Sequence, residues 1–240
     1  MLVRRIRWIA ALSLAVPLAL AGSGAALARP AAAPPASSPY LAGYTSQVKG
    51  SGSIASITVP SFTCPPGADT RVAFGIADQG PSDAQAVVRT AVDAVCEAEG
   101  GIVEYGVEVV VPGQTVVTSF VSPGDVLTFS ITYGKHHQVT AAAIDQTDPR
   151  GSETLTGTAP KAALHFGALP LVEGDSNLLP VPDFGRLDVV NAVAAGAPLT
   201  NQSATRYRRV DDDGQTAIQA SRFARMPPNS GSFSLVFKHS

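Results

Sequence analysis

Apolar residues recur at every second position through much of this chain, and this period limits the folds open to it more than any other feature. A period of two is that of a β-strand with one buried face, because successive side chains point to opposite sides of the strand. Three segments carry it clearly: Leu127, Phe129, Ile131 and Tyr133; Ala55, Ile57 and Val59; and Phe233, Leu235 and Phe237.

Short polar turns separate these segments. Ser122-Pro123-Gly124-Asp125, Asp213-Gly214 and Asn229-Ser230-Gly231 combine the residue types that β-turns require. Many short strands joined by such turns indicate an antiparallel sandwich or barrel. The 240 residues, 45% of them apolar, suit one all-β domain with a sizeable core.

The N-terminus has the layout of an export signal. Three arginines precede the apolar run Trp8 to Ala21, and small residues follow at Ala26 and Ala28. We therefore predict a signal peptide at 1–28, a Pro/Ala-rich linker at 29–39 that is extended or disordered, and a folded domain at 40–240. The run is short for a membrane span, although an uncleaved anchor is the alternative. General secretion is favoured over the twin-arginine route that Arg4 and Arg5 suggest.

Charge and cysteine content agree with a secreted protein. The formal charge of −2 becomes −5 once Arg4, Arg5 and Arg7 are removed, which argues against a nucleic-acid partner. Both cysteines, Cys64 and Cys96, lie in the exported part, where oxidising conditions favour a disulfide. A pair of free buried thiols is the alternative.

Residues 82–98 depart from the alternating pattern. Ala84, Val87, Val88, Ala91, Val92 and Val95 keep helical spacing, and Gly100-Gly101 would end a helix. Alternation of Val87, Arg89 and Ala91 is also present, so a strand stays open. The local pattern favours one short helix here.

Eight segments resemble, in order and in rough spacing, the secreted glutamic peptidases of the eqolisin family, from Leu41 to the C-terminus. The paired segments are LAGYTS with WAGY, SITVPSFTC with TWTVPSVSC, FGIADQ with WVGIDG, VVRTAVDAVC with VEQIGTDQDC, YGVEVVVP with AWYEMYP, VSPGDVLTFSITY with VSPGDVITASVTY, KAALHFGALP with SSAEWIVEAP, and LPVPDFGRLDVVNA with LPLADFGTVTFTNA. The resemblance implies a concanavalin A-like sandwich of two large antiparallel sheets, with a substrate cleft on the concave face. For the segment VVRTAVDAVC, the resemblance implies a strand and a turn instead of a helix.

The resemblance also implies a mechanism, in which a glutamate activates water and a glutamine amide stabilises the oxyanion. Here Arg89 stands at the glutamine position and Leu164 at the glutamate position. A guanidinium could still donate to an oxyanion, but leucine cannot carry a proton. Alternation along the strand predicts that His165 looks away from a cleft that Leu164 faces. Glu108, at the glutamate of AWYEMYP, is the candidate surviving cleft carboxylate, whereas Glu173 has no assigned place.

The walls of the implied cleft differ as well. Five family tryptophans correspond to non-aromatic or smaller residues, namely Leu41, Ala73, Ile57, Gly106 and His165. We therefore predict a secreted, monomeric, non-proteolytic member of the family that binds a peptide or a cell-surface glycan. The predicted binding residues are Glu108, Leu41, Gly106 and Arg89. The alternatives are an acid glutamic endopeptidase with altered catalytic residues, and a lectin-like module.

No cofactor or metal is expected. The adjacent His136 and His137 lack partners for a metal site, and Asp211-Asp212-Asp213-Gly214 lacks the spaced ligands of a calcium loop. The acidic run is expected to be a solvated hairpin turn.

Overall fold

The computed structural model describes residues 33–47, 52–65, 67, 69–79, 88–97, 101, 103–159, 163–169, 172–173, 177–178, 180–224 and 231–239. The predicted signal peptide, and the linker up to residue 32, lie outside them. Within the linker, Ala36–Ser38 forms strand β1, which is mostly exposed and pairs in parallel with β16 (Ala204–Val210).

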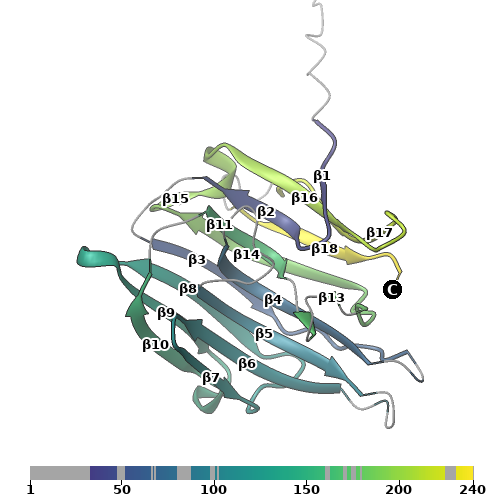
Figure 1. Ribbon diagram of the computed structural model, residues 1–240, viewed down its shortest axis with the longest axis horizontal. Helices are drawn as coiled ribbons and strands as arrows, with labels where there is room; N and C mark the ends of the chain where they lie inside the picture. Colours follow the sequence, from purple (N-terminus) through teal and green to yellow (C-terminus); the bar gives the residue numbers. More distant parts are fainter. Residues whose placement is uncertain are drawn as a thin grey trace, which may run out of the picture. The chain divides into compact units, whose positions relative to one another are not determined.

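Strands make up almost all of the regular structure in the described residues, which confirms the all-β prediction (Figure 1). Besides β1 and β16, they are β2 (Ala42–Ser46), β3 (Gly52–Thr58), β4 (Thr70–Gln79), β5 (Val88–Cys96), β6 (Val103–Val111), β7 (Gln114–Thr118), β8 (Val126–Tyr133), β9 (Gln138–Asp145), β10 (Glu153–Thr158), β11 (Ala163–Leu169), β12 (Val172–Glu173), β13 (Asn177–Leu178), β14 (Arg186–Ala194), β15 (Ala197–Pro198), β17 (Thr216–Ala220) and β18 (Phe233–Phe237). Single 3-10 turns occur at η1 (Lys135–His137), η2 (Pro149–Gly151) and η3 (Leu199–Asn201).

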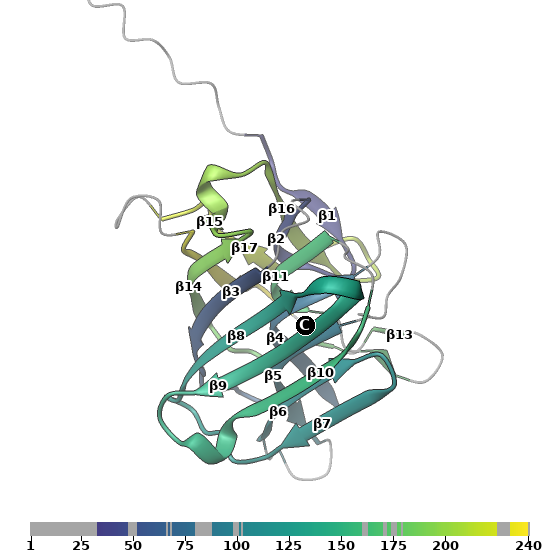
Figure 2. The ribbon, with the colours of Figure 1, turned by 90° about the vertical axis from the view of Figure 1, so that its left-hand side faces the viewer.

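The strands form a sandwich of two layers that are joined along one hydrogen-bonded path. Layer A contains, in spatial order, β10, β9, β8, β3, β14 and β18, and layer B contains β2, β11, β4, β5, β6 and β7; β17 and β16 connect them. In Figure 2, β8, β9 and β10 lie in front of β4, β5 and β6. Strand β6 packs against β9 and β10, and β4 packs against β3 and β8.

The core between the layers consists of the alternate residues that the sequence pattern selected. Leu127, Phe129 and Ile131 of β8 are fully buried, opposite Phe74 of β4 and Phe166 of β11. Each fully buried side chain of this size contributes about 1.5–3 kcal/mol relative to the exposed state. The same pattern therefore fixes which face of each layer points outward.

The helix prediction for residues 82–98 is wrong over Val88–Cys96, which form strand β5; residues 80–87 lie outside the described part. Both faces of β5 are partly buried. Val88 and Val92 contact the core, whereas Ala91 belongs to a second apolar cluster on the opposite face. Apolar residues on both faces of one strand produce the three- and four-residue spacing that resembles a helix.

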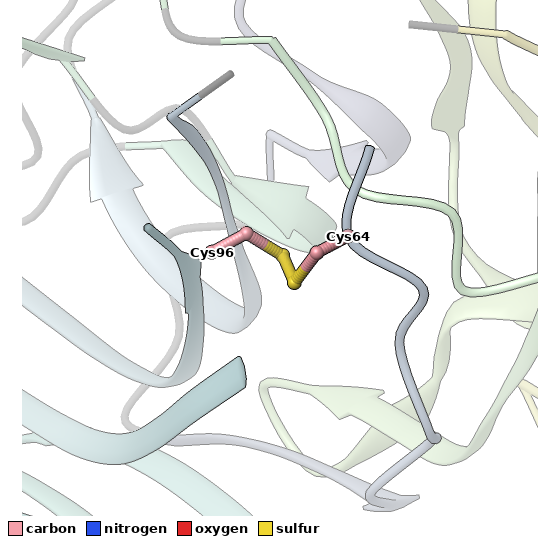
Figure 3. The surroundings of a disulfide bond; sticks show 2 residues. All are labelled: Cys64 and Cys96. Carbon is pink, nitrogen blue, oxygen red and sulfur yellow. A yellow bond between two sulfur atoms is a disulfide. The ribbon is translucent and has the colours of Figure 1, made fainter. Parts of the chain in front are cut away.

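The predicted disulfide is confirmed. Cys64, in the segment between β3 and β4, is bonded to Cys96, the last residue of β5 (Figure 3). The two cysteines are separated by 32 positions. Closing a loop of this length stabilises the fold by roughly 3–4 kcal/mol in the chain-entropy model.

Candidate functional site

Three charged side chains lie together on the outward side of layer B, which we call the site face. Arg89 and Asp93 project from β5, because alternate residues of this strand face the core. Glu108 projects from β6, where it is registered with Ala91, between Arg89 and Asp93. We refer to Arg89, Asp93 and Glu108 as the charged cluster.

The guanidinium of Arg89 holds both carboxylates of the cluster. Its Nη2 forms an ion pair with Glu108 Oε2 and lies 3.9 Å from Asp93 Oδ2. The side chains of Arg89, Asp93 and Glu108 are only 14%, 18% and 16% exposed. Water therefore screens these interactions much less than it would at an open surface.

Burial raises the pKa of Asp93 from its ordinary 3.8 to about 6, against the opposing attraction of Arg89 and Arg71. Its Oδ1 is buried and accepts no hydrogen bond from the described residues. Asp93 is thus the carboxylate whose charge changes in mildly acidic solution. Perturbed groups of this kind are typical of functional sites.

The structure reverses the predicted orientations of Leu164 and His165. Leu164 is 3% exposed and belongs to the core between the layers. His165 lies on the site face, since it is registered with Ala77 of β4, which in turn is registered with Arg89. The alternation was predicted correctly, but its phase was wrong by one residue. Both faces of β11 carry apolar residues, so the sequence pattern does not show which face is the core side.

Arg89 and Leu164 therefore lie on opposite faces of layer B, and His165 is the residue of β11 in the row of Arg89. Strand β11 contains no acidic residue at any position. Burial lowers the pKa of His165 from 6.5 to about 4, and its Nδ1 is buried without a hydrogen-bond partner in the described part of the chain. His165 is consequently neutral at pH 7.

A small apolar cluster fills the middle of the site face. Five buried residues form it, and Tyr207 of β16 packs against them. They are Leu41, Ala73, Ala77, Ala91 and Leu169. Of the five positions that correspond to family tryptophans, Leu41, Ala73, Gly106 and His165 lie on the site face, whereas Ile57 lies in the core.

Three glycines on adjacent strands run across the same face. Gly43 of β2, Gly167 of β11 and Gly75 of β4 are successive partners in the strand register. A Cβ atom would lie 1.9 Å from the Phe166 carbonyl oxygen at Gly43 and 2.3 Å from the Ala42 carbonyl oxygen at Gly167, where φ is +132°. Only glycine fits such a close backbone approach. The glycine row continues through Ala91 to Glu108.

The four predicted binding residues share this face: Arg89 and Glu108 in the charged cluster, Gly106 opposite Asp93, and Leu41 in the apolar cluster. Sequence reasoning missed Asp93. The family segment VEQIGTDQDC has an aspartate three positions before its cysteine, as Asp93 stands before Cys96, and this signal would have identified it.

The remaining candidates stay outside the site. His136 and His137 are exposed in η1, and no group of three metal-ligating side chains occurs among the described residues. Asp211 closes the turn between β16 and β17 by accepting hydrogen bonds from Gln215 and Gly214. The side chain of Glu173 lies outside the described part. Within that part, no helix has the length and apolar character to cross a membrane.

Solved structures of glutamic peptidases have the same fold. Scytalido-glutamic peptidase with a peptide-based transition-state analog aligns with a TM-score of 0.62 at 14% identity, covering 82% of this chain and 97% of that one. SCP-B, an eqolisin in complex with the tripeptide Ala-Ile-His, gives 0.59 at 14% identity, covering 82% and 97%. Aspergilloglutamic peptidase from Aspergillus niger gives 0.54 at 18% identity, covering 70% and 99%.

No curated protein sequence matches significantly. The model of the Peptidase A4 family matches residues 41–224, which is most of the chain and includes the charged cluster and the glycine row. The protein is therefore a member of the Peptidase A4 (eqolisin) family.

Proposed function

We propose that this protein is an exported, non-proteolytic eqolisin that binds extended peptides on its site face. The observation that carries the proposal is the pairing of Arg89 with both Glu108 and Asp93. Glu108 and Asp93 are carboxylates that project beside Arg89 on the site face, and the guanidinium forms an ion pair with each of them. A general base must be free to take a proton from water, and Glu108 is engaged by Arg89. Asp93, whose pKa burial raises to about 6, is protonated between about pH 2 and 5 and cannot accept a proton there.

His165 does not replace the missing glutamate. It lies in the row of Arg89, two strand spacings away across Ala77, so position is not what disqualifies it. Below a pH of about 4 the imidazole is protonated and cannot accept a proton. At higher pH it could act as a base, but the oxyanion donor in its row, Arg89, is engaged with Glu108.

The side chains of the site face favour a peptide over a glycan. Glycan sites use aromatic platforms, and Tyr207 is the aromatic residue that packs on the apolar cluster. The face instead combines aliphatic side chains with a charged cluster, which suits a chain of alternating apolar side chains and polar amides. Peptide ligands in the solved eqolisin complexes support the same choice.

A cleavage assay tests the loss of catalysis. The purified protein is incubated with a denatured protein substrate between about pH 2 and 5, where a partly protonated carboxylate serves as acid and base. We expect no cleavage. Cleavage that disappears in Glu108→Gln would instead support the alternative, an acid glutamic endopeptidase with altered catalytic residues.

A restoring variant sharpens this test. Because His165 lies on the site face and Leu164 in the core, Arg89→Gln with His165→Glu places an amide and a carboxylate in one row of the site face. We expect acid-dependent cleavage only in this double variant. Arg89→Gln with Leu164→Glu is the matched control, and it buries a carboxylate in the core, so it should unfold.

Peptide binding is tested by fluorescence anisotropy with labelled hexapeptides of varied sequence. We expect a subset to bind, and Glu108→Gln to change their affinity, because it alters the partner of Arg89. Thr132→Gln, on the outer side of layer A, is the control. If no hexapeptide binds, or if both variants behave alike, the proposed ligand is wrong.

Export and a monomeric state belong to the same proposal. The N-terminal pattern and the disulfide support passage through an oxidising compartment. Mass spectrometry of protein from the culture medium should find Arg29 as the first residue, and light scattering should give the mass of one chain. An intact N-terminus in the cell pellet would contradict export.

A further inference from the structure

The charged cluster contains more negative than positive charge. Arg89 supplies one cation, whereas Asp93 and Glu108 supply two carboxylates when both are ionised. Their side chains are at most 18% exposed, so solvent compensates the excess charge only weakly. The excess lies on Asp93, because Glu108 forms the closer ion pair and Arg89 Nη2 is 3.9 Å from Asp93 Oδ2.

Arg71 and Glu104, in the described parts of β4 and β6, are the further charged side chains beside Asp93 on the site face. They lie in the next row, on either side of Val95. Both are exposed and their charges are opposite, so they offset each other. Arg71 and Arg89 attract the Asp93 carboxylate, but burial outweighs both in its pKa. The cluster therefore still lacks a cation for Asp93.

An exposed apolar side chain lies on the other side of β6 from Asp93. Val117 of β7 is 62% exposed and is on the site face, because it is registered with Glu108. Gly106 lies between them: it is registered with Asp93, and a Cβ atom added to it would lie 3.4 Å from Val117 Cγ1. A carboxylate and an apolar contact thus flank a position that has no side chain of its own.

This arrangement matches a side chain with an apolar stem and a cationic head. Lysine and arginine cover apolar surface with their methylene groups and keep the charged end in polar surroundings. A hydrogen bond between such a head and a carboxylate is stronger than one between neutral groups. An acidic side chain in the same place would instead add a third carboxylate to the cluster.

We propose that the site face selects peptides that carry a lysine or arginine side chain, whose stem lies on Val117 and whose cationic head pairs with Asp93. The inference rests on the proposed peptide binding and names the class of ligand within it. The bound peptide supplies the second cation, so that two cations face the two carboxylates of the cluster. Asp93 is then the residue that determines specificity, and Gly106 leaves the path to it open.

The test compares three peptides, Ala-Val-Xaa-Val-Ala-Gly amide with a fluorescent label on the N-terminus, in which Xaa is lysine, norleucine or glutamate. Fluorescence anisotropy measures their binding. At pH 7.5 the lysine peptide should bind at least about tenfold more tightly than the norleucine peptide, and the glutamate peptide most weakly. At pH 5 the preference should fall to about twofold, because Asp93, with a pKa of about 6, is then mostly protonated. His165, with a pKa of about 4, is still mostly neutral there.

Two variants test the charge and the path separately. Asp93→Asn removes the charge with little change of shape, and it should bind the lysine and norleucine peptides equally at pH 7.5. Gly106→Val keeps every charge but places a side chain between Val117 and Asp93, and it should also lose the preference. Its Cβ atom fits, since the nearest atoms are 3.4 Å away. Asp213→Asn, in the exposed turn after β16, is the control and should keep the preference.

The outcomes separate this inference from the proposed function. If the lysine and norleucine peptides bind the parent equally at pH 7.5, or if the preference persists in Asp93→Asn, the inference is wrong while peptide binding stands. The same holds if the lysine peptide does not bind although other hexapeptides do. If no hexapeptide binds at all, the proposed function fails and the inference fails with it.

Discussion

Replacing Asp93 by asparagine should stabilise the protein at neutral pH and have little effect in acid. Burial raises the pKa of this carboxyl to about 6, whereas its ordinary value is 3.8. Between these two values the folded state binds more protons than the unfolded state, so stability falls as the pH rises. The stability of the neutral form is fully present below pH 3.8 and is lost as the pH rises through about 6.

The size of the effect follows from that difference. At about 1.4 kcal/mol per pH unit, ionisation of Asp93 costs at most about 3 kcal/mol at pH 7.5, and residual exposure of the side chain reduces this value. Asparagine has nearly the same shape and no charge, so Asp93→Asn should gain about 1–3 kcal/mol there. For a domain of this size, the melting temperature should rise by about 2–4 °C per kcal/mol.

Urea and thermal unfolding at pH 7.5 and pH 3.5, for the parent and for Asp93→Asn, measure this directly. Asp213→Asn, in the exposed turn after β16, is the control and should change neither value. A variant that is less stable than the parent at pH 7.5 would refute the reasoning, because the attraction between Asp93 and Arg89 would then outweigh the cost of burial.

Three further perturbations test other parts of the structure. Replacing both Cys64 and Cys96 by serine should lower the free energy of unfolding by roughly 3–4 kcal/mol, measured by urea titration, and an unchanged midpoint would contradict the loop-closure argument. Gly167→Ala should cost about 3 kcal/mol or more, because its Cβ would overlap the Ala42 carbonyl. Gly113→Ala, at φ +80° with open space around it, should cost about 1–2 kcal/mol. Equal losses in thermal unfolding would show that the glycine row is not sterically required. Arg89→Ala should destabilise by about 2–4 kcal/mol at pH 7.5, because it removes the guanidinium that pairs with the largely buried Glu108 and Asp93. Asp93→Asn should recover part of this loss, and the absence of any recovery would separate Asp93 from the cluster.

The sequence correctly predicted the strands that have one solvent-facing side and one side buried in the core. Residues 126–133 form β8 with Leu127, Phe129 and Ile131 in the core, because the outward residues are polar enough to fix the phase. Residues 88–96 were harder, since Ala91 is buried on the face opposite Val92. Periodicity cannot separate helix from strand when both sides are apolar.

The same limit explains the error in the candidate site. Strand β11 is apolar on both faces, with Phe166 in the core and Leu169 in the apolar cluster of the site face. Nothing in its own sequence indicates which side Leu164 takes. The resemblance supplied a position for the catalytic glutamate but not its direction, and the register through Ala77 to Arg89 was needed to place His165 on the site face.

The disulfide has a consequence for where this protein can work. Cys96 ends the strand that carries Arg89 and Asp93, and its bond to Cys64 attaches that end to the segment leading into β4. Reducing surroundings, such as the cytosol, would cut this attachment and loosen the strand close to Asp93. The proposed peptide-binding face is thus coupled to the redox state of its compartment, and protein produced without oxidative folding should bind peptides more weakly.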